Sequence, residues 1–135
     1  MITQTKPFTP PVDSYIEKIH TMFEKKWFTN HGDFVVKLEQ ELADYFNSPY
    51  FLLVTNGTIA LQLAIKALEL KGEIITTPFS YVATTASIAW ENCDPIFCDI
   101  SPSTLNINAN KIEALITENT SAILVTNVFG YPCDF

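Results

Sequence analysis

Hydrophobic residues recur at helical spacing near the beginning of the chain, after a polar, proline-rich leader. Three of them lie on one helical face: Ile16, Ile19 and Phe23. Ser14 and Glu17 have the spacing of a capping box, which predicts that a helix begins there. Residues 27–32 favour a turn, since they include asparagine, glycine and threonine. A second amphipathic helix is predicted over about residues 33–46, and Pro49 follows its end.

From residue 50 onward, short apolar runs alternate with helical segments. The apolar runs predict strands at residues 50–54, 73–77, 95–99 and 122–127, and the intervening segments predict helices at residues 59–70, 81–90 and 108–116. The helix over residues 59–70 carries only a narrow polar stripe, so we expect most of it to be buried. Strands that alternate with helices imply right-handed βαβ units and a mainly parallel sheet. The sequence therefore predicts an α/β fold.

Length and composition limit the possible classes of protein. The 135 residues suffice for one compact domain, and 47% hydrophobic with 17% charged residues excludes disorder and a coiled coil. The net charge is −7 and every one of the eight cations is a lysine, which argues against a nucleic-acid surface. No apolar run reaches membrane-spanning length, and the start of the chain is unlike a signal peptide. Three scattered cysteines and two distant histidines favour a reducing cytoplasm and no metal site.

The first candidate for chemistry is the junction between the predicted strand at residues 50–54 and the helix that follows. Ligands of open parallel sheets lie beyond the carboxyl ends of strands, and a helix N-terminus offers free N–H groups to an anion. Gly57 allows close approach of a ligand, and the hydroxyl of Thr58 adds a donor, so phosphate is the natural ligand. The alternative is an ordinary helix cap that includes Asn56, because asparagine and threonine are common there.

Weaker candidates follow the next two predicted strands. Phe79 and Tyr81 either stack against a flat heterocycle or seal the edge of the core. Asp99 is either a ligand carboxylate or a turn residue, and the asparagines within residues 106–110 are predicted to cap the next helix. The sequence contains no G-x-G-x-x-G, P-loop, G-x-S-x-G or C-x-x-C motif.

Six motifs follow one another from residue 27 to the end of the chain. They are W-F-T-N-H-G at 27–32, L-E-Q-E-L-A-D-Y-F at 38–46, T-N-G-T-I-A-L at 55–61, T-P-F-S-Y-V-A-T at 77–84, D-P-I-F-C-D-I at 94–100 and N-V-F-G-Y-P-C-D at 127–134. In this order they resemble the nucleotide-sugar aminotransferases of the DegT/DnrJ/EryC1/StrS family. The resemblance implies the N-terminal portion of a fold-type-I large domain, as in transferases that depend on pyridoxal phosphate. A helical arm over residues 1–32 would precede an incomplete large domain over residues 33–135.

The resemblance also implies roles for particular residues. The cofactor-binding residues that it implies are Gly57, Thr58, Ile59 and Tyr81, and the residues at the substrate mouth are Thr29, Asn30 and His31. The glycine, the threonine and the amide of the isoleucine would hold the cofactor phosphate, and the tyrosine ring would stack on the pyridine ring. The family further implies a homodimer that moves an amino group from glutamate to a nucleotide-linked keto-sugar.

The same resemblance places the Schiff-base lysine, and the aspartate that pairs with the pyridine nitrogen, beyond residue 135. None of the eight lysines lies in a matching motif, and transamination needs that amine as anchor and base. We therefore expect no catalytic residue in this chain, weak or absent binding of pyridoxal 5'-phosphate, and no activity. Two alternatives stay open. One is a non-catalytic oligomerising or binding module on the same fold, and the other is a flavodoxin-like phosphate binder that takes FMN or a nucleotide.

Overall fold

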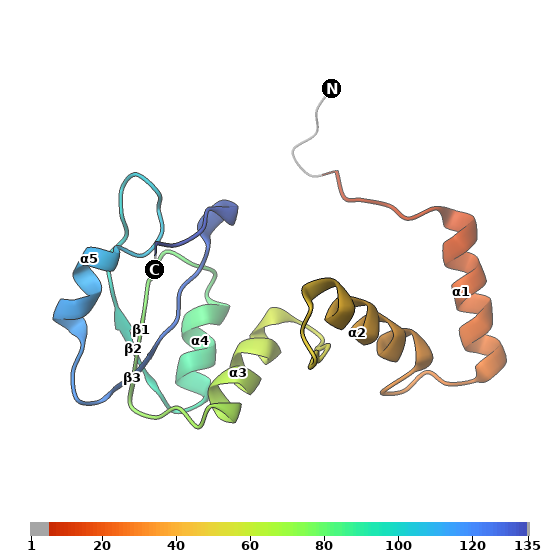
Figure 1. Ribbon diagram of the computed structural model, residues 1–135, viewed down its shortest axis with the longest axis horizontal. Coiled ribbons are helices and arrows are strands. Elements are labelled where there is room, and N and C mark those ends of the chain that lie inside the picture. Colours follow the sequence, from red (N-terminus) through yellow and green to blue (C-terminus); the bar gives the residue numbers. More distant parts are fainter. Residues whose placement is uncertain (1–5, 135) are drawn as a thin grey trace. The chain divides into compact units, whose positions relative to one another are not determined.

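The computed structural model describes residues 6–134; residues 1–5 of the predicted arm and Phe135 lie outside the described residues (Figure 1). The chain divides into two compact units, Met1–Leu53 and Val54–Phe135. The first unit contains the helices α1 (Val12–Lys25) and α2 (Asp33–Phe46). The second contains, in chain order, α3 (Gly57–Ala67), β1 (Glu73–Thr76), α4 (Ala83–Trp90), β2 (Asp94–Phe97), α5 (Ala109–Ile112), the 3-10 turn η1 (Glu113–Leu115), β3 (Thr120–Ile123) and the 3-10 turn η2 (Val128–Gly130).

Both helices predicted for the first unit are confirmed, but the predicted capping box is wrong. Helix α1 begins at Val12 with Pro11 at the N-cap, and no side chain caps it. Because the helix starts two residues before Ser14, that hydroxyl lies in the first turn and donates back to the carbonyl of Pro11 at 3.0 Å. Each helix ends at a residue in the left-handed conformation, Lys26 after α1 and Asn47 after α2.

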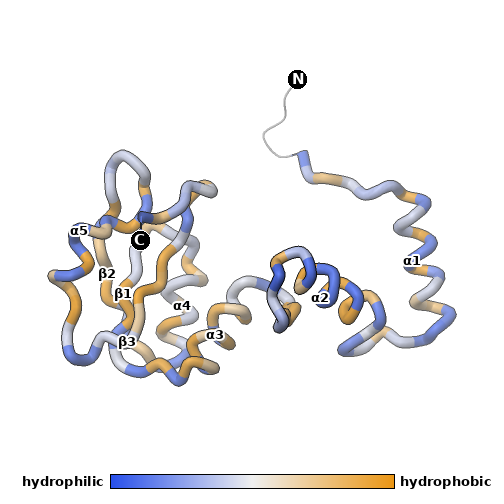
Figure 2. The backbone as a smooth tube through the Cα atoms, viewed as in Figure 1, coloured by the Kyte–Doolittle hydropathy of each residue, from blue (hydrophilic) through white to orange (hydrophobic). Residues whose placement is uncertain are grey.

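The sheet of the second unit is parallel, as the alternation of strands and helices predicted. Its strand order is β2-β1-β3, so β1 is the central strand. Ile75 of β1 is in register with Ile96 of β2 and with Ile123 of β3. Figure 2 shows hydrophobic residues along all three strands. In the central strand Ile74 and Ile75 are both fully buried, as in a strand that is covered on both faces.

Successive side chains of β1 point to opposite faces and build two cores. On one face Ile74 packs with Ile65 of α3 and Ile88 of α4. On the other face Ile75 packs with Cys98 and Ile107, and apolar residues of α5 and η1 cover this cluster. Figure 1 shows α3 and α4 on one side of the sheet and α5 on the other. The second unit therefore has three layers, with helices on both faces of the sheet.

Two expectations about the region before β1 are wrong. Residues 50–54 do not form a strand; the amide of Leu53 instead donates to Glu39 Oε1 of α2 at 2.8 Å, and Phe51 stacks on Phe46. The segment therefore packs against α2 and does not pair with a neighbouring strand. Helix α3 is also less buried than its narrow polar stripe suggested, since Ile65 is its one buried residue among those described.

The predicted strand over residues 122–127 lies slightly earlier in the chain, at β3.

Candidate functional site

The N-terminus of α3 carries both a helix cap and free donors. Asn56 occupies the N-cap, and its Oδ1 accepts a hydrogen bond from the amide of Ile59 at 3.0 Å. The ordinary cap is thus formed, and it uses one of the N–H groups that the resemblance assigns to phosphate. Within residues 6–134, the amides of Gly57 and Thr58 have no acceptor. Those two N–H groups, at the positive end of the helix dipole, suit an anion.

The space in front of this turn is open. A Cβ atom built on Gly57 would meet no heavy atom within 4 Å, and the glycine is exposed. Thr58, the next residue, is half-buried. An atom the size of a methyl group therefore has room beside the Cα atom of Gly57.

Helix α4 holds the first turn of α3 through a buried serine. Ser87 is 0% exposed, and its Oγ donates to the carbonyl oxygen of Thr58 at 3.4 Å. The sequence of α4 is rich in small residues, which allow two helices to approach closely. That small-residue pattern signalled tight packing, but it did not single out Ser87 as the residue that contacts the candidate phosphate turn.

The loop between β1 and α4 presents an exposed aromatic ring. Thr77 is fully buried after β1; its Oγ1 accepts from the amide of Phe79 at 3.2 Å, and its carbonyl accepts from Ser80 Oγ at 3.3 Å. The carbonyl of Tyr81 accepts from the amide of Thr84 at 3.0 Å, so the backbone of Tyr81 is held by the first turn of α4. Because Tyr81 is 80% exposed, its ring does not seal the core.

The predicted phosphate turn and Tyr81 belong to the same unit and are both bonded to α4. Helix α3 leads by a short connection into the start of β1, so its N-terminus points toward the carboxyl end of that strand (Figure 1). The loop that bears Tyr81 leaves this same end. Along α4, the residues bonded to Tyr81 and to Thr58 are Thr84 and Ser87, three positions apart and so separated by about 4.5 Å of helix rise. This arrangement brings the four predicted cofactor-binding residues to one edge of the second unit.

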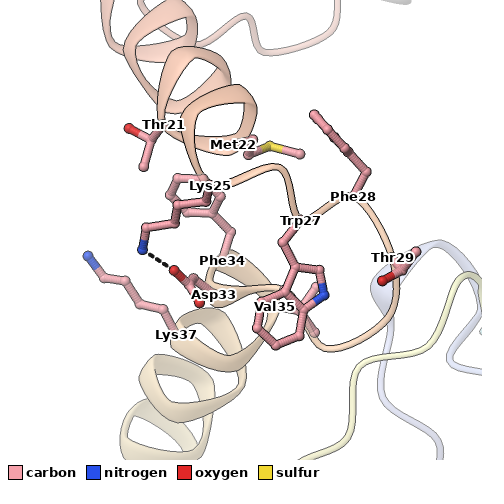
Figure 3. A pocket seen from close by; sticks show the side chains of 11 residues that line it. Thr21, Met22, Lys25, Trp27, Phe28, Thr29, Asp33, Phe34, Val35 and Lys37 are labelled. Carbon is pink, nitrogen blue, oxygen red and sulfur yellow. Dashed lines mark hydrogen bonds and ion pairs between the residues drawn. The ribbon is translucent and has the colours of Figure 1, made fainter.

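The three predicted substrate-mouth residues lie in the first unit, in the turn between α1 and α2. Thr29 lines a pocket of about 420 Å³, together with aromatic side chains that include Trp27 and Phe34 (Figure 3). The indole Nε1 of Trp27 donates to the carbonyl of Asn30 at 3.1 Å. His31 is exposed and has a left-handed backbone, with φ of 56°. The turn is therefore ordered by its own hydrogen bond, and Thr29 faces the pocket.

The remaining polar candidates have structural partners. Asp99 Oδ1 accepts from the amide of Ile100 at 2.9 Å, and Oδ2 accepts from Lys111 Nζ at 2.8 Å. These hydrogen bonds, that of Lys111 first, lower the pKa of Asp99. The contacts favour the turn interpretation of Asp99 over the ligand interpretation. Within residues 6–134 no three side chains are grouped so as to hold a metal ion, and no helix is long and apolar enough to cross a membrane.

One functional candidate was missed by the sequence analysis. Asn108 caps α5 as predicted, by accepting from the amide of Asn110 at 3.1 Å. Asn106, from the same asparagine-rich stretch, is instead buried and bonded to the segment after β3, more than twenty residues away along the chain. No local pattern signals such a distant partner.

Solved structures identify this arrangement. The fold is the N-terminal portion of the large domain of a fold-type-I transferase, with a parallel sheet flanked by helices. It is similar to the sugar aminotransferase CalS13 from Micromonospora echinospora, with a TM-score of 0.84, 28% identity and coverage of 99% of this chain and 36% of that one. It is also similar to NtdA from Bacillus subtilis with bound cofactor PMP, with a TM-score of 0.82, 28% identity and coverage of 99% and 33%.

The family follows from the sequence comparison. The profile of the DegT/DnrJ/EryC1/StrS aminotransferase family matches residues 12–135, and the chain belongs to that family. A dTDP-4-amino-4,6-dideoxy-D-glucose transaminase from Escherichia coli is 39% identical over 133 residues, which cover 98% of this chain and 36% of the relative. A UDP-2-acetamido-2-deoxy-3-oxo-D-glucuronate aminotransferase from Pseudomonas aeruginosa is 39% identical over 106 residues, which cover 77% and 30%. The chain thus spans about a third of the length of these curated relatives.

Proposed function

We propose that this chain is the N-terminal part of an aminotransferase that depends on pyridoxal phosphate and moves an amino group from glutamate to a nucleotide-linked keto-sugar. The observation that carries the proposal is the pair of free amides at Gly57 and Thr58, at the same edge as the exposed ring of Tyr81. Family membership supports the reaction class, because the matched relatives are named as transaminases of nucleotide-linked sugars.

The residues present at this edge fit the phosphorylated cofactor. The amides of Gly57 and Thr58 and the Thr58 hydroxyl would hold the phosphate, and the amide of Ile59 would join them if the Asn56 side chain turned away. The ring of Tyr81 would cover the pyridine ring. When bound, the cofactor supplies the electron sink that amino transfer requires. The Asn56 cap keeps the first turn of α3 helical, so the donors are in place before any ligand arrives.

The proposal also divides the chain into an arm and the beginning of a large domain. Residues 1–32 would form a helical arm, and the large domain would begin at residue 33; Thr29, Asn30 and His31 would lie at the mouth through which the sugar enters. We propose a cytoplasmic homo-oligomer, and the three free, buried cysteines suit a reducing compartment. None of the eight lysines lies in a motif that matches the anchoring lysine, so the 135-residue chain alone would bind the cofactor weakly and would not transaminate.

Binding of pyridoxamine 5'-phosphate tests the site. This form has no aldehyde and cannot react with the eight lysines, so its binding reports on non-covalent contacts alone. We expect weak, saturable shifts of the backbone NMR signals of Gly57, Thr58 and Tyr81, with competition by inorganic phosphate at the turn. Thr58→Ala and Tyr81→Ala should each weaken binding. Tyr45→Ala removes a tyrosine that is equally exposed but lies in the first unit, and serves as the control. Shifts scattered over the chain, with none at residues 57–59, would overturn the proposal.

A second candidate is a non-catalytic module that assembles with a partner. Large apolar side chains are exposed on the second unit, among them Leu68, Trp90 and Phe97. Exposed apolar surface of this kind promotes association. Light scattering coupled to size exclusion separates the candidates when combined with the titration. A stable oligomer that takes no pyridoxamine phosphate favours the module, whereas a monomer argues against it.

A further inference from the structure

The side chain of Asn106 is buried and makes three hydrogen bonds to one distant segment. Asn106 is 2% exposed. Its Oδ1 accepts from the amide of Val128 at 2.8 Å, and its Nδ2 donates to the carbonyls of Tyr131 and Pro132, each at 3.0 Å. The side chain is thereby hydrogen-bonded to both ends of the turn that follows β3. A buried amide bonded on both its oxygen and its nitrogen specifies one conformation of its partners.

The turn held by Asn106 contains a residue in an unfavourable backbone conformation. Phe129 has φ of 52° and ψ of 23°, in the left-handed region that bulky residues rarely occupy. Such a conformation persists only where the surrounding structure enforces it, and it is concentrated at functional sites. Here the neighbours enforce it. Besides Asn106, Asn127 closes the turn by accepting from the amide of Cys133 through Oδ1 at 2.9 Å.

The strained turn lies at the ligand edge of the sheet. β1 and β3 are paired, parallel neighbours, so the segments that leave their carboxyl ends emerge at the same edge. One of these segments bears Tyr81 and the other bears Phe129, and both residues are 80% exposed. An aromatic ring held outside the core by a buried hydrogen-bond network is arranged to contact something other than the described residues.

We propose that Phe129 is a second aromatic contact for the ligand bound at this edge, and that Asn106 is the positioning residue that presents it. The proposal rests on the proposed function, because the ligand is the phosphorylated pyridine assigned there. Asn106 does not touch the ligand. It acts by holding the backbone of the turn, so that the ring of Phe129 has one direction instead of many.

Two variants test separately the contact made by the Phe129 ring and the positioning role of Asn106. Phe129→Gly removes the ring and relieves the left-handed backbone, so the fold should be at least as stable. The dissociation constant of pyridoxamine 5'-phosphate should rise about threefold to tenfold, as expected for loss of one stacking contact. Asn106→Ala removes all three bonds to the turn. We expect the backbone chemical shifts of Phe129 to leave their left-handed values and the affinity to fall by a similar factor.

The control is Ile88→Val, which loosens the core on the opposite face of the sheet and leaves the turn intact. It should lower stability without changing the Phe129 shifts or the affinity, and so shows what destabilisation alone does. Unchanged affinity in Phe129→Gly overturns the contact, and unchanged Phe129 shifts in Asn106→Ala overturn the positioning role. If the unaltered chain takes no pyridoxamine phosphate, the proposed function fails and the contact fails with it, whereas the shifts in Asn106→Ala still decide whether Asn106 holds the turn.

Discussion

The hydroxyl of Ser87 donates across 3.4 Å to the carbonyl oxygen of Thr58, which joins the middle of α4 to the first turn of α3. In the sequence, Thr58 belongs to the junction before a predicted helix and Ser87 lies within the helix predicted over residues 81–90. The bond sets the position of the free amides of α3 against the helix whose first turn holds Tyr81. The candidate phosphate turn is therefore fixed by a residue that makes no contact with any ligand in the proposal.

Replacement of Ser87 should therefore lower stability in a way that depends on size. Ser87→Ala loses one hydrogen bond, at a cost of about 1 kcal/mol in the free energy of unfolding. Ser87→Val also forces extra volume into a position that is 0% exposed, and should cost roughly 1–3 kcal/mol. Urea denaturation measures both. Ser103→Ala, on an exposed loop, is the matched control and should change stability by less than about 0.5 kcal/mol. A Ser87→Ala protein as stable as the original would show that the bond contributes nothing.

Asp99 and Lys111 should each shift the pKa of the other. The hydrogen bond from Lys111 lowers the pKa of Asp99, and the same contact raises the pKa of Lys111. A lowered carboxyl pKa in the folded state means that the ion pair favours folding above the ordinary aspartate pKa, and that this contribution is lost as the pH falls through the folded value. Lys111→Gln should therefore move the Asp99 pKa upward, as followed by carboxyl carbon NMR. Lys66→Gln, on α3, should leave it unchanged, and an Asp99 pKa that ignores Lys111 would contradict the pairing.

Much of the architecture is predictable because it follows from local pattern. The bounds of α2 and the asparagine cap of α3 depend on residues within a few positions of one another, and the parallel sheet follows from the alternation of strands and helices along the chain. The failures at residues 50–54 and at Asn106 have non-local causes. The apolar run at residues 50–54 has strand composition, but its backbone bonds to Glu39 of α2. The role of Asn106 depends on carbonyls about 25 residues away, and a periodicity argument does not extend so far. The strain at Phe129 is invisible in the sequence for the same reason.

The thiols should be slow to react in the folded protein. Cys93, Cys98 and Cys133 are free and buried. Burial also raises the pKa of the Cys93 and Cys98 thiols, so that less of each is present as the reactive thiolate at neutral pH. With an aromatic disulfide reagent at pH 7.5, the native chain should react much more slowly than the same chain in denaturant, where all three thiols become available. Rapid reaction of one thiol under native conditions would mean that its cluster opens frequently.

Replacement by alanine should lower stability at Gly72, and at Gly57 it should lower ligand affinity instead. Gly72 has φ of 75°, and an added Cβ would lie 2.6 Å from the carbonyl oxygen of Asn119, so Gly72→Ala should lower the free energy of unfolding by roughly 1–3 kcal/mol. Gly57→Ala meets no atom within 4 Å and no positive φ, so stability should change little. Its methyl group would nevertheless occupy the space in which the phosphate is proposed to lie, and affinity for pyridoxamine 5'-phosphate should fall. Thermal unfolding of both variants tests the predicted stabilities, and the NMR titration of both variants tests the predicted affinities. A Gly57→Ala chain that keeps its full affinity would move the phosphate away from this turn, whatever its stability.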